Sequence, residues 1–403
     1  VNKLANYLRN TFGYEPGSFL DNPEKVKATR ITAKVDWNLN SSNKLTFSYR
    51  YNDGERYNTS SSSTTSINFY NNGYIFPTTS HTATGELRST FKRGSTNRFL
   101  LTYTNVLDDR NPIGQPFPRV TINDGSGRYV FGTENFSGAN LLAQKNWTLY
   151  DAFKINLGKH AMTIGTDNLY SDAKNVFIRD NFGTYTYANL NAFMTGQNPT
   201  RYQRSFSLLD NNNEKSTASA AAFKYINLAF FVNDEVRLND RFTLNLGVRL
   251  DKTEFLTTPK TDPFFNDSAI AKISPYYDLH GARSGQIANV PWSVSPRVGF
   301  TYRIPEERIT IRGGVGLFTG RMPLVWPGGV YNNNGVSVGG IDPTATQIAS
   351  VPAPFFKPDP YNQYSSTDFG ISLANSKGQV DLMAKEFKLP KIFRTSLAVD
   401  KQL

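Results

Sequence analysis

Apolar and polar residues alternate with a period of two through much of this chain. The clearest stretch, 228–251, has two alternating halves joined by the polar turn Asn239-Asp240-Arg241. In its second half, every other residue is apolar: Phe242, Leu244, Leu246, Val248 and Leu250. The residues between these are polar or small, and they include Asn245, Arg249 and Asp251. Alternation of this length predicts a β-hairpin with one polar face and one apolar face.

The same pattern recurs along the chain. It predicts further hairpins around turns at 40–43, 93–97, 158–159 and 305–307, and a last strand near 393–399. We count about eleven strands, most of them roughly 10–14 residues long, whereas strands of soluble proteins average about five or six residues. A tilted strand needs roughly 9–11 residues to cross a membrane. Strand length therefore favours a membrane-spanning sheet.

Two kinds of connection take turns between the predicted strands. Links of roughly two to six residues close the hairpins. Long polar stretches separate the hairpins, at about 52–80, 108–145, 178–220, 256–292 and 320–389. Short turns at one end and long loops at the other are typical of transmembrane barrels, in which the long loops lie outside the cell. The chain is therefore predicted to be all-β, as part of a transmembrane antiparallel β-barrel.

Composition agrees with this prediction. Mean hydropathy is −0.45, which is expected when only alternate residues meet lipid. The net charge is +11, but Lys and Arg are dispersed rather than clustered, so no nucleic-acid partner is expected. The absence of cysteine excludes disulfides and thiolate metal sites. It also fits passage through an oxidising periplasm.

The sequence contains no recognisable catalytic site, so the protein is not expected to be an enzyme. The three histidines are scattered, without the paired spacing of a zinc site, and no cofactor or metal is expected. The patch Asp210-Asn211-Asn212-Asn213-Glu214 could bind calcium but lacks the spacing of a calcium loop. The glycine cluster at 313–316 lies inside a predicted strand and indicates either close packing within a barrel or a bend.

One acidic residue disturbs the alternation. Asp234 has the same parity as the apolar residues Val232 and Val236. Two explanations stay open: hydration of Asp234 at the headgroup level near the short turn, or a β-bulge that turns its side chain into the lumen.

Several segments together resemble TonB-dependent outer-membrane transporters. Phe231-Val232-Asn233-Asp234-Glu235 and the stretch 238–249 resemble the central hairpin of these barrels. The next hairpin is similar at 295–300 and 311–316. Leu389-Pro390, Arg394-Thr395 and Val399-Asp400-Lys401 resemble the Oar-like branch of Bacteroidota and their relatives.

The resemblance covers residues 29–403 and implies a 22-stranded barrel closed by an N-terminal plug domain. It also implies a nutrient ligand bound by extracellular loops and plug, and energy delivered by the TonB complex through an N-terminal box. The chain has about half the strands and shows neither plug nor box. We therefore expect an internal segment, with residues 1–28 as an extracellular loop remnant and 29–403 as a partial barrel. Its expected location is the outer membrane of a Gram-negative bacterium, in contact with lipid.

The leading functional prediction is TonB-dependent uptake of a bulky nutrient, either an oligopeptide or a carbohydrate. Loop aromatics are candidate ligand-binding residues, with packing inside the loops as the alternative for each: Trp326, Tyr331, Tyr361 and Tyr364. Asn245, Arg249 and Asp251 are expected to face the lumen, and Phe242, Leu244, Leu246, Val248 and Leu250 to face lipid. Two alternative functions remain: a passive outer-membrane porin, and a surface-exposed β-structured binding protein.

Overall fold

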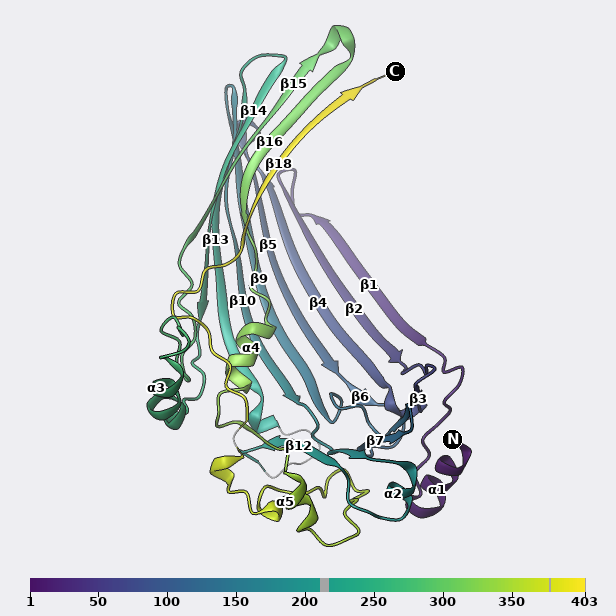
Figure 1. Ribbon diagram of the computed structural model, residues 1–403. Helices are drawn as coiled ribbons and strands as arrows, with labels where there is room; N and C mark the ends of the chain where they lie inside the picture. The colour runs from purple at the N-terminus through teal and green to yellow at the C-terminus, as the bar shows by residue number, and fades with distance from the viewer. Residues whose placement is uncertain (211–216, 377, 403) are drawn as a thin grey trace.

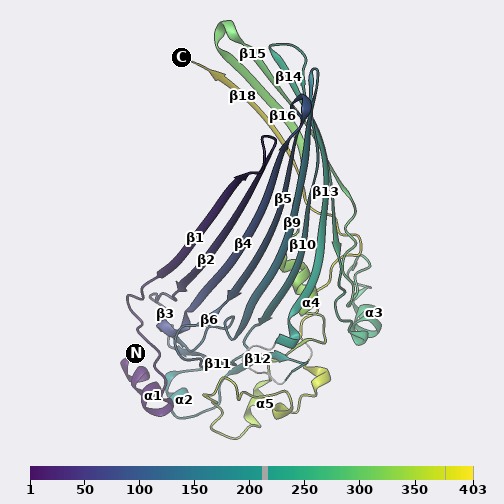
Figure 2. The same ribbon diagram turned by 180° about the vertical axis from the view of Figure 1, so that it is seen from behind.

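Eleven long antiparallel strands form one curved sheet (Figures 1 and 2). The computed structural model describes residues 1–210, 217–376 and 378–402. In spatial order the strands are β1 (Lys25–Asn38), β2 (Asn43–Asn58), β4 (Tyr74–Thr90), β5 (Thr96–Asp109), β9 (Ala139–Leu157), β10 (His160–Ile178), β13 (Ala221–Arg237), β14 (Phe242–Phe255), β15 (Ser293–Ile304), β16 (Ile309–Thr319) and β18 (Lys391–Lys401). A short strand, β6 (Asn111–Pro112), pairs with β4 beside this path. The predicted antiparallel sheet is confirmed.

The strands are longer than the alternation alone indicated. They contain between 11 and 19 residues, enough to cross a membrane at a tilt. The first predicted long loop, 52–80, is wrong in extent, because β2 and β4 continue into it as far as the pair Asn58↔Tyr74. Residues 52–55 and 78–82 contain no apolar residue apart from Gly54. The hydrophobic alternation therefore ends before the ladder of backbone hydrogen bonds between β2 and β4 ends.

Short turns and long connections lie at opposite ends of the sheet, as predicted. The short turns join β1 to β2, β4 to β5, β9 to β10, β13 to β14 and β15 to β16, and they gather at the top of Figure 1. The turn between β9 and β10 is only two residues long, Gly158-Lys159, and Gly158 has a φ of 60°. This left-handed conformation favours glycine because it has no side chain to clash.

The long connections build a second folded layer, which we call the cap. Its six-stranded sheet runs in the order β17 (Val338–Ile341), β12 (Arg201–Ser207), β11 (Thr184–Tyr187), β7 (Arg119–Asp124), β8 (Gly127–Phe131) and β3 (Ser66–Asn68). Three helices join it: α1 (Asn2–Phe12), α2 (Leu190–Met194) and α5 (Ala345–Ala349). Figure 1 shows the cap below the long strands. Sequence reasoning had treated these segments only as polar loops.

The cap has its own apolar core. Leu4 and Leu8 lie four positions apart on α1 and are fully buried, because residues at this spacing share one helix face. Tyr185 and Tyr202 from neighbouring strands are also fully buried. Tyr14, just after α1, stacks on Phe117 with ring centroids 4.0 Å apart. Aromatic packing therefore joins segments that are far apart in the sequence into one unit.

The helices are short, and all of the named ones except α1, which precedes β1, lie in the long connections. Besides those of the cap, they include α3 (Ile270–Ile273) and α4 (Val325–Asn332). No helix in the described part of the chain has the length and apolar character needed to cross a membrane. The first long strand begins at Lys25, within the segment 1–28 that was expected to be a loop remnant. The division at residue 28 stays a prediction.

Candidate functional site: the polar wall of the sheet

The register of the long strands separates two faces. Residues directly opposite each other in antiparallel strands point to the same side. Asn245 lies opposite Glu235 and Gly299, whereas its neighbour Leu246 lies opposite Asp234 and Val298. Asn245, Arg249 and Asp251 thus share one side, which we call the polar face. Phe242, Leu244, Leu246, Val248 and Leu250 share the other, which we call the apolar face.

The apolar face is exposed along the whole sheet. Leu246 and Val248 are each 41 % exposed, and Leu397 at the far edge is 72 % exposed. Further exposed apolar residues on this face include Val35, Trp37, Phe47, Leu101, Trp147, Ile164, Val298 and Val399. Soluble monomers rarely expose contiguous apolar patches of this extent. This exposure supports the prediction that the apolar face contacts lipid.

A long connection folds over the polar face. Tyr331 in α4 stacks on Phe223 of β13, with ring centroids 4.8 Å apart. Phe223 is an even number of positions from Phe231, which lies opposite Arg249, so both rings are on the polar face. Figure 1 shows α4 lying over the sheet near the cap. The polar face is therefore covered by chain near the cap, and we call this face the polar wall; that it lines a lumen stays a prediction.

Arg249 holds two carboxylates together on this wall. Its Nε donates to Asp251 at 2.8 Å, and its Nη2 donates to Asp167 on β10 at 3.2 Å. All three side chains are about one quarter exposed. Arg249 and Asp251, both selected from the sequence, thus lie in one ion-pair network with Asp167, which sequence analysis did not select.

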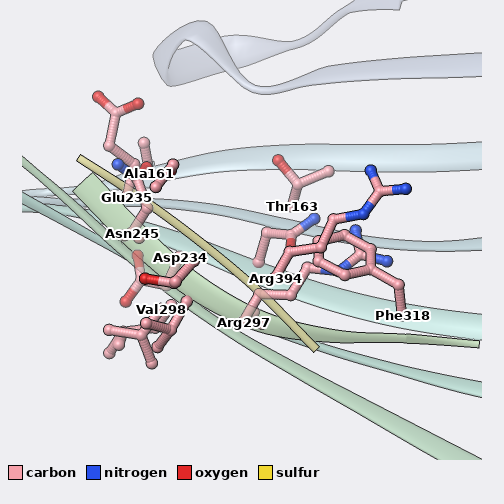
Figure 3. Close-up of a pocket in the computed structure, with 18 of the residues that line it drawn as sticks. Ala161, Thr163, Asp234, Glu235, Asn245, Arg297, Val298, Phe318 and Arg394 are labelled. Carbon is pink, nitrogen blue, oxygen red and sulfur yellow. The ribbon is translucent and has the colours of Figure 1, made fainter. Parts of the chain in front are cut away.

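A cavity of about 610 Å³ lies on the wall toward the short turns. Seven strands contribute to its lining, from β9 to β18, because the sheet is strongly curled here (Figure 3). The guanidinium carbon of Arg297 lies 4.5 Å from the ring centroid of Phe318. The guanidinium carbon of Arg394 lies 5.6 Å from the same centroid. Two cations therefore share one aromatic ring at the cavity.

Neither cation at this ring has an acidic partner. Within the described residues, no ion pair and no side-chain hydrogen bond is formed by Arg297 or Arg394. Two other arginines on the same face do form ion pairs: Arg249 as described, and Arg312 with Asp400 at 3.0 Å. Two carboxylates, Asp234 and Glu235, also line the cavity, and they pair with His160 and Arg237 rather than with the two arginines at the ring.

Several glycines, which have no side chain, lie on the polar face beside these arginines. Gly247, Gly299 and Gly314 line the cavity on adjacent strands. A Cβ on Gly316 would come within 3.1 Å of both Arg297 and Phe318, so the absence of a side chain there makes room for their stacking. The glycine cluster noted in the sequence therefore lies beside a cavity. Gly313, in contrast to Gly314 and Gly316, lies on the apolar face, opposite Phe300.

Sequence analysis did not select Arg297, Phe318 or Arg394 as site residues. The alternation could have placed them on the polar face, since Arg297 lies two residues from Gly299 and Arg394 two residues from Ser396. Alternation gives the face on which a side chain lies. It does not show which arginine has a carboxylate partner.

The four candidate loop aromatics do not form one site. Tyr331 and Tyr364 are both only 6 % exposed and pack in separate apolar clusters, Tyr331 on the wall and Tyr364 in the cap. Trp326 is 46 % exposed with its ring edge against Phe387, and Tyr361 is 41 % exposed against Phe182. Only Trp326 and Tyr361 present substantial ring surface. Ligand binding by any of the four stays a prediction.

Asp234 lies on the apolar face in an unbroken ladder. It pairs in register with Met162 and Leu246, so no bulge redirects its side chain. Its Oδ2 lies 2.7 Å from Nδ1 of His160, the residue that follows the Gly158-Lys159 turn. The structure therefore agrees with the first explanation for Asp234, a position near the short turns, and excludes the second, a β-bulge.

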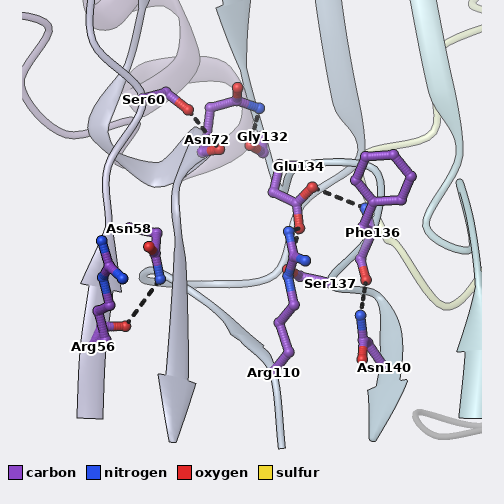
Figure 4. A network of polar contacts seen from close by, with 10 residues as sticks. All are labelled: Arg56, Asn58, Ser60, Asn72, Arg110, Gly132, Glu134, Phe136, Ser137 and Asn140. Carbon is purple, nitrogen blue, oxygen red and sulfur yellow. Dashed lines mark hydrogen bonds and ion pairs between the residues drawn. The ribbon is translucent and has the colours of Figure 1, made fainter. Parts of the chain in front are cut away.

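A polar network ties the cap to the sheet (Figure 4). Arg110, directly after β5, donates from Nη2 to Glu134 at 2.7 Å and from Nε to Ser137 at 2.8 Å. The other oxygen of Glu134 accepts the backbone N–H of Phe136 at 3.0 Å. The guanidinium also lies 3.5 Å from the ring centroid of Tyr74 on β4. The long connection 110–138 is therefore fixed where it leaves the sheet.

Burial changes the acid–base behaviour of the cap. Burial lowers the pKa of Arg204, whose guanidinium donates to the carbonyls of Gln363 and Tyr364. Burial also raises the pKa of Tyr185 and Tyr202 above the usual tyrosine range. No group of three or more acidic or histidine side chains able to hold a metal occurs in the described ranges. Asn211 to Glu214 of the candidate calcium patch lie outside those ranges.

Comparison with known proteins gives a family match over the whole chain. The family model described as "Outer membrane beta barrel domain" matches residues 1–403. The solved outer membrane transporter YddB from Escherichia coli is 15 % identical, with a TM-score of 0.48, over 76 % of this chain and 33 % of that chain. The siderophore receptor PiuA from Acinetobacter baumannii is 10 % identical, with a TM-score of 0.46, over 94 % and 48 %. The chain thus spans a third to a half of these structures. No curated protein sequence matches it.

Proposed function

We propose that this chain, which belongs to the outer membrane beta barrel domain family, forms part of the wall of a transporter that imports a bulky nutrient. The supporting observation is the eleven-strand sheet with an exposed apolar face and a covered polar face. Such a sheet meets lipid on one side and encloses a polar lumen on the other. The proposal assigns transport to the protein and no catalysis.

The energy source in this proposal is the TonB complex, acting through a plug domain in the lumen. It is supported by the resemblance of segments 231–249 and 295–316 to TonB-dependent transporters, and by the resemblance of Leu389-Pro390, Arg394-Thr395 and Val399-Asp400-Lys401 to their Oar-like branch. The cap, built on one end of the sheet from several long connections, is the proposed site of nutrient capture. An oligopeptide or a carbohydrate is the proposed nutrient. Trp326 and Tyr361 are the loop aromatics with exposed rings for contact.

Energy dependence tests this function against a passive porin. Uptake of labelled oligopeptides and oligosaccharides is compared in cells that have or lack the gene for the full-length protein, with and without an uncoupler of the proton-motive force. We expect gene-dependent uptake that the uncoupler abolishes. Gene-dependent uptake that persists with the uncoupler would identify a passive porin. Ligand binding without any uptake would identify a surface binding protein.

A further inference from the structure

A row of charged residues crosses the apolar face near the cap. Lys145 on β9 lies directly opposite Asp172 on β10, and Asp172 lies directly opposite Lys224 on β13. These three strands are neighbours in the middle of the sheet (Figure 2). Lys224 directly follows Phe223, which stacks on Tyr331 on the polar face, so the charged row lies on the other, apolar face.

A third lysine joins this row, and the charges do not balance. Lys174 follows Asp172 by two positions on β10 and is diagonal to both Lys145 and Lys224. Lys224 pairs with Asp172 at 3.7 Å and is also diagonal to Glu254 on β14. In the part of the chain that the structure describes, Lys145 and Lys174 form no ion pair and no side-chain hydrogen bond. We call these three lysines and Asp172 the lysine patch.

A row of aromatic residues lies next to the lysine patch, on the side of the short turns. Its members are paired in register on β5, β9 and β10: Tyr103, Trp147 and Tyr170. The ring centroids of Tyr103 and Trp147 are 4.7 Å apart, and Trp147 is 47 % exposed. Aromatic rows of this kind form the girdles of transmembrane barrels at the boundary between hydrocarbon and headgroups. The lysine patch therefore lies on the headgroup side of such a girdle.

The position of Lys145 along β9 agrees with this depth. From Leu157 at the short turn to Lys145 the strand advances by twelve residues, which is about 40 Å at roughly 3.3 Å per residue. A strand tilt of about 40° turns this length into about 30 Å along the membrane normal, whereas the apolar band of such barrels is about 25 Å tall. Lys145 thus lies just beyond the hydrocarbon.

We propose that the lysine patch binds a phosphate group of a glycolipid in the outer leaflet of the outer membrane, whose acyl chains cover the aromatic row. Basic clusters at a membrane surface bind anionic lipid headgroups, and two ammonium groups without an acidic partner suit a phosphate. The patch is continuous with the apolar face, so its ligand carries apolar chains as well as charge. The proposal rests on the proposed function only in placing the apolar face in lipid and the cap outside the cell.

Native mass spectrometry of the full-length protein in detergent tests this site without a transport measurement. The probe is diphosphoryl lipid A, and the comparison lipid is the same molecule without its two phosphates. We expect one tightly bound diphosphoryl lipid A for each barrel, and binding of the dephosphorylated lipid that is at least about tenfold weaker. Equal affinity for the two lipids would overturn the proposal.

Lysine variants show whether the patch causes this preference. Lys145→Gln combined with Lys174→Gln should lower the affinity for diphosphoryl lipid A at least about tenfold, because each lysine beside an anionic headgroup contributes about fivefold. Lys145→Arg combined with Lys174→Arg keeps the charge and should retain the affinity within about twofold. An unchanged affinity in the Gln variant would refute the site.

A matched control removes the same charge elsewhere on the sheet. Lys92 lies in the turn after β4, and Lys154 lies on the polar face of β9, opposite Thr163. Lys92→Gln combined with Lys154→Gln should leave lipid binding unchanged, and an equal loss in this variant would show that only net charge matters. Heat-modifiable migration confirms that each variant barrel has folded.

The lipid site and the proposed transport function fail separately. A protein that imports its nutrient but does not prefer the phosphorylated lipid would refute the lipid site and leave the transport function standing. A protein that binds diphosphoryl lipid A through the lysine patch but imports no nutrient would support the lipid site and refute the transport function.

Discussion

The guanidinium of Arg110 is held at once by the carboxylate of Glu134, at 2.7 Å, and by the ring face of Tyr74, 3.5 Å from its centroid. Both charged side chains are largely buried, with 16 % and 12 % exposed. Arg110→Lys keeps the charge but loses the planar stacking and the second donor to Ser137. We expect the local unfolding free energy of segment 110–138 to fall by about 1–3 kcal/mol. Hydrogen exchange of its amides in the full-length protein measures the loss.

The control for this prediction is Arg201→Lys. Arg201 also pairs with a carboxylate, Asp342, but both side chains are about half exposed. Exposed ion pairs contribute about 0–1 kcal/mol, so exchange rates near residue 201 should barely change. Equal effects of the two substitutions would show that burial of the Arg110 network does not strengthen it.

Two residues on β14 should respond oppositely to charge. Val248→Arg places a cation on the exposed apolar face opposite Val232 and Pro296, where contact with lipid makes it cost about 2–4 kcal/mol near the membrane midplane. Asn245→Arg places the same cation on the polar face and should be tolerated. Heat-modifiable migration of the full-length protein measures the folded barrel fraction. Normal assembly of Val248→Arg would contradict the membrane assignment of this face.

The cap should lose stability in alkaline solution before the long strands do. Burial raises the pKa of Tyr185 and Tyr202, so both favour the neutral form in the folded cap. A group whose pKa is raised by folding stabilises the fold below its unfolded pKa, about 10 for tyrosine, and this stability is lost as pH rises. Near-ultraviolet circular dichroism from pH 8 to 12 should show a transition above pH about 10, shifted upward in Tyr185→Phe. A transition that Tyr185→Phe leaves in place would refute this assignment.

Loop aromatics should separate into two groups by burial. Tyr331→Ala and Tyr364→Ala remove rings that are 94 % covered and should destabilise their clusters by about 3–5 kcal/mol. Trp326→Ala and Tyr361→Ala remove exposed rings and should leave thermal stability nearly unchanged while they weaken nutrient binding. Melting temperature and equilibrium binding of the transported nutrient distinguish the groups. Unchanged binding in both exposed-ring variants would remove them from the ligand site.

The long strands were predictable because a sheet between two different solvents imposes the same alternation on each strand. Leu246 and Asn245 show this rule locally, since one-residue steps reverse the face. The strand ends around Asn58 and Tyr74 were not predictable, because the polar residues 52–55 and 78–82 next to them continue the ladder without hydrophobic alternation, with side-chain hydrogen bonds such as Thr79 to Asp53. The cap was missed for a related reason. Its strands are short and pair across distant segments, as in β3 with β8 and β7 with β11, so no local period marks them.

For the arginines of the polar wall, the sequence predicts the face of the sheet but not the ion-pair partner. Arg249, Arg297 and Arg394 all follow the polar parity, yet of these three only Arg249 forms ion pairs within the described residues. The ion pair between Arg249 and Asp167 depends on the register of β10, β13 and β14, which is a tertiary property. A carboxylate four strands away in the sequence gives no local signal of the ion pair that it forms.

Strand direction at the two edges of the long sheet limits how it can be sealed. With eleven strands alternating in direction, β1 and β18 run the same way, from the cap toward the short turns (Figure 2). Direct joining of these edges, or of two copies of the sheet around a common axis, would therefore produce parallel seams. An all-antiparallel cylinder requires an odd number of further strands between β18 and β1, which yields the even total usual in bacterial outer membranes. The segment that completes the barrel must therefore match this sheet in the direction of its edge strands as well as in its number of strands.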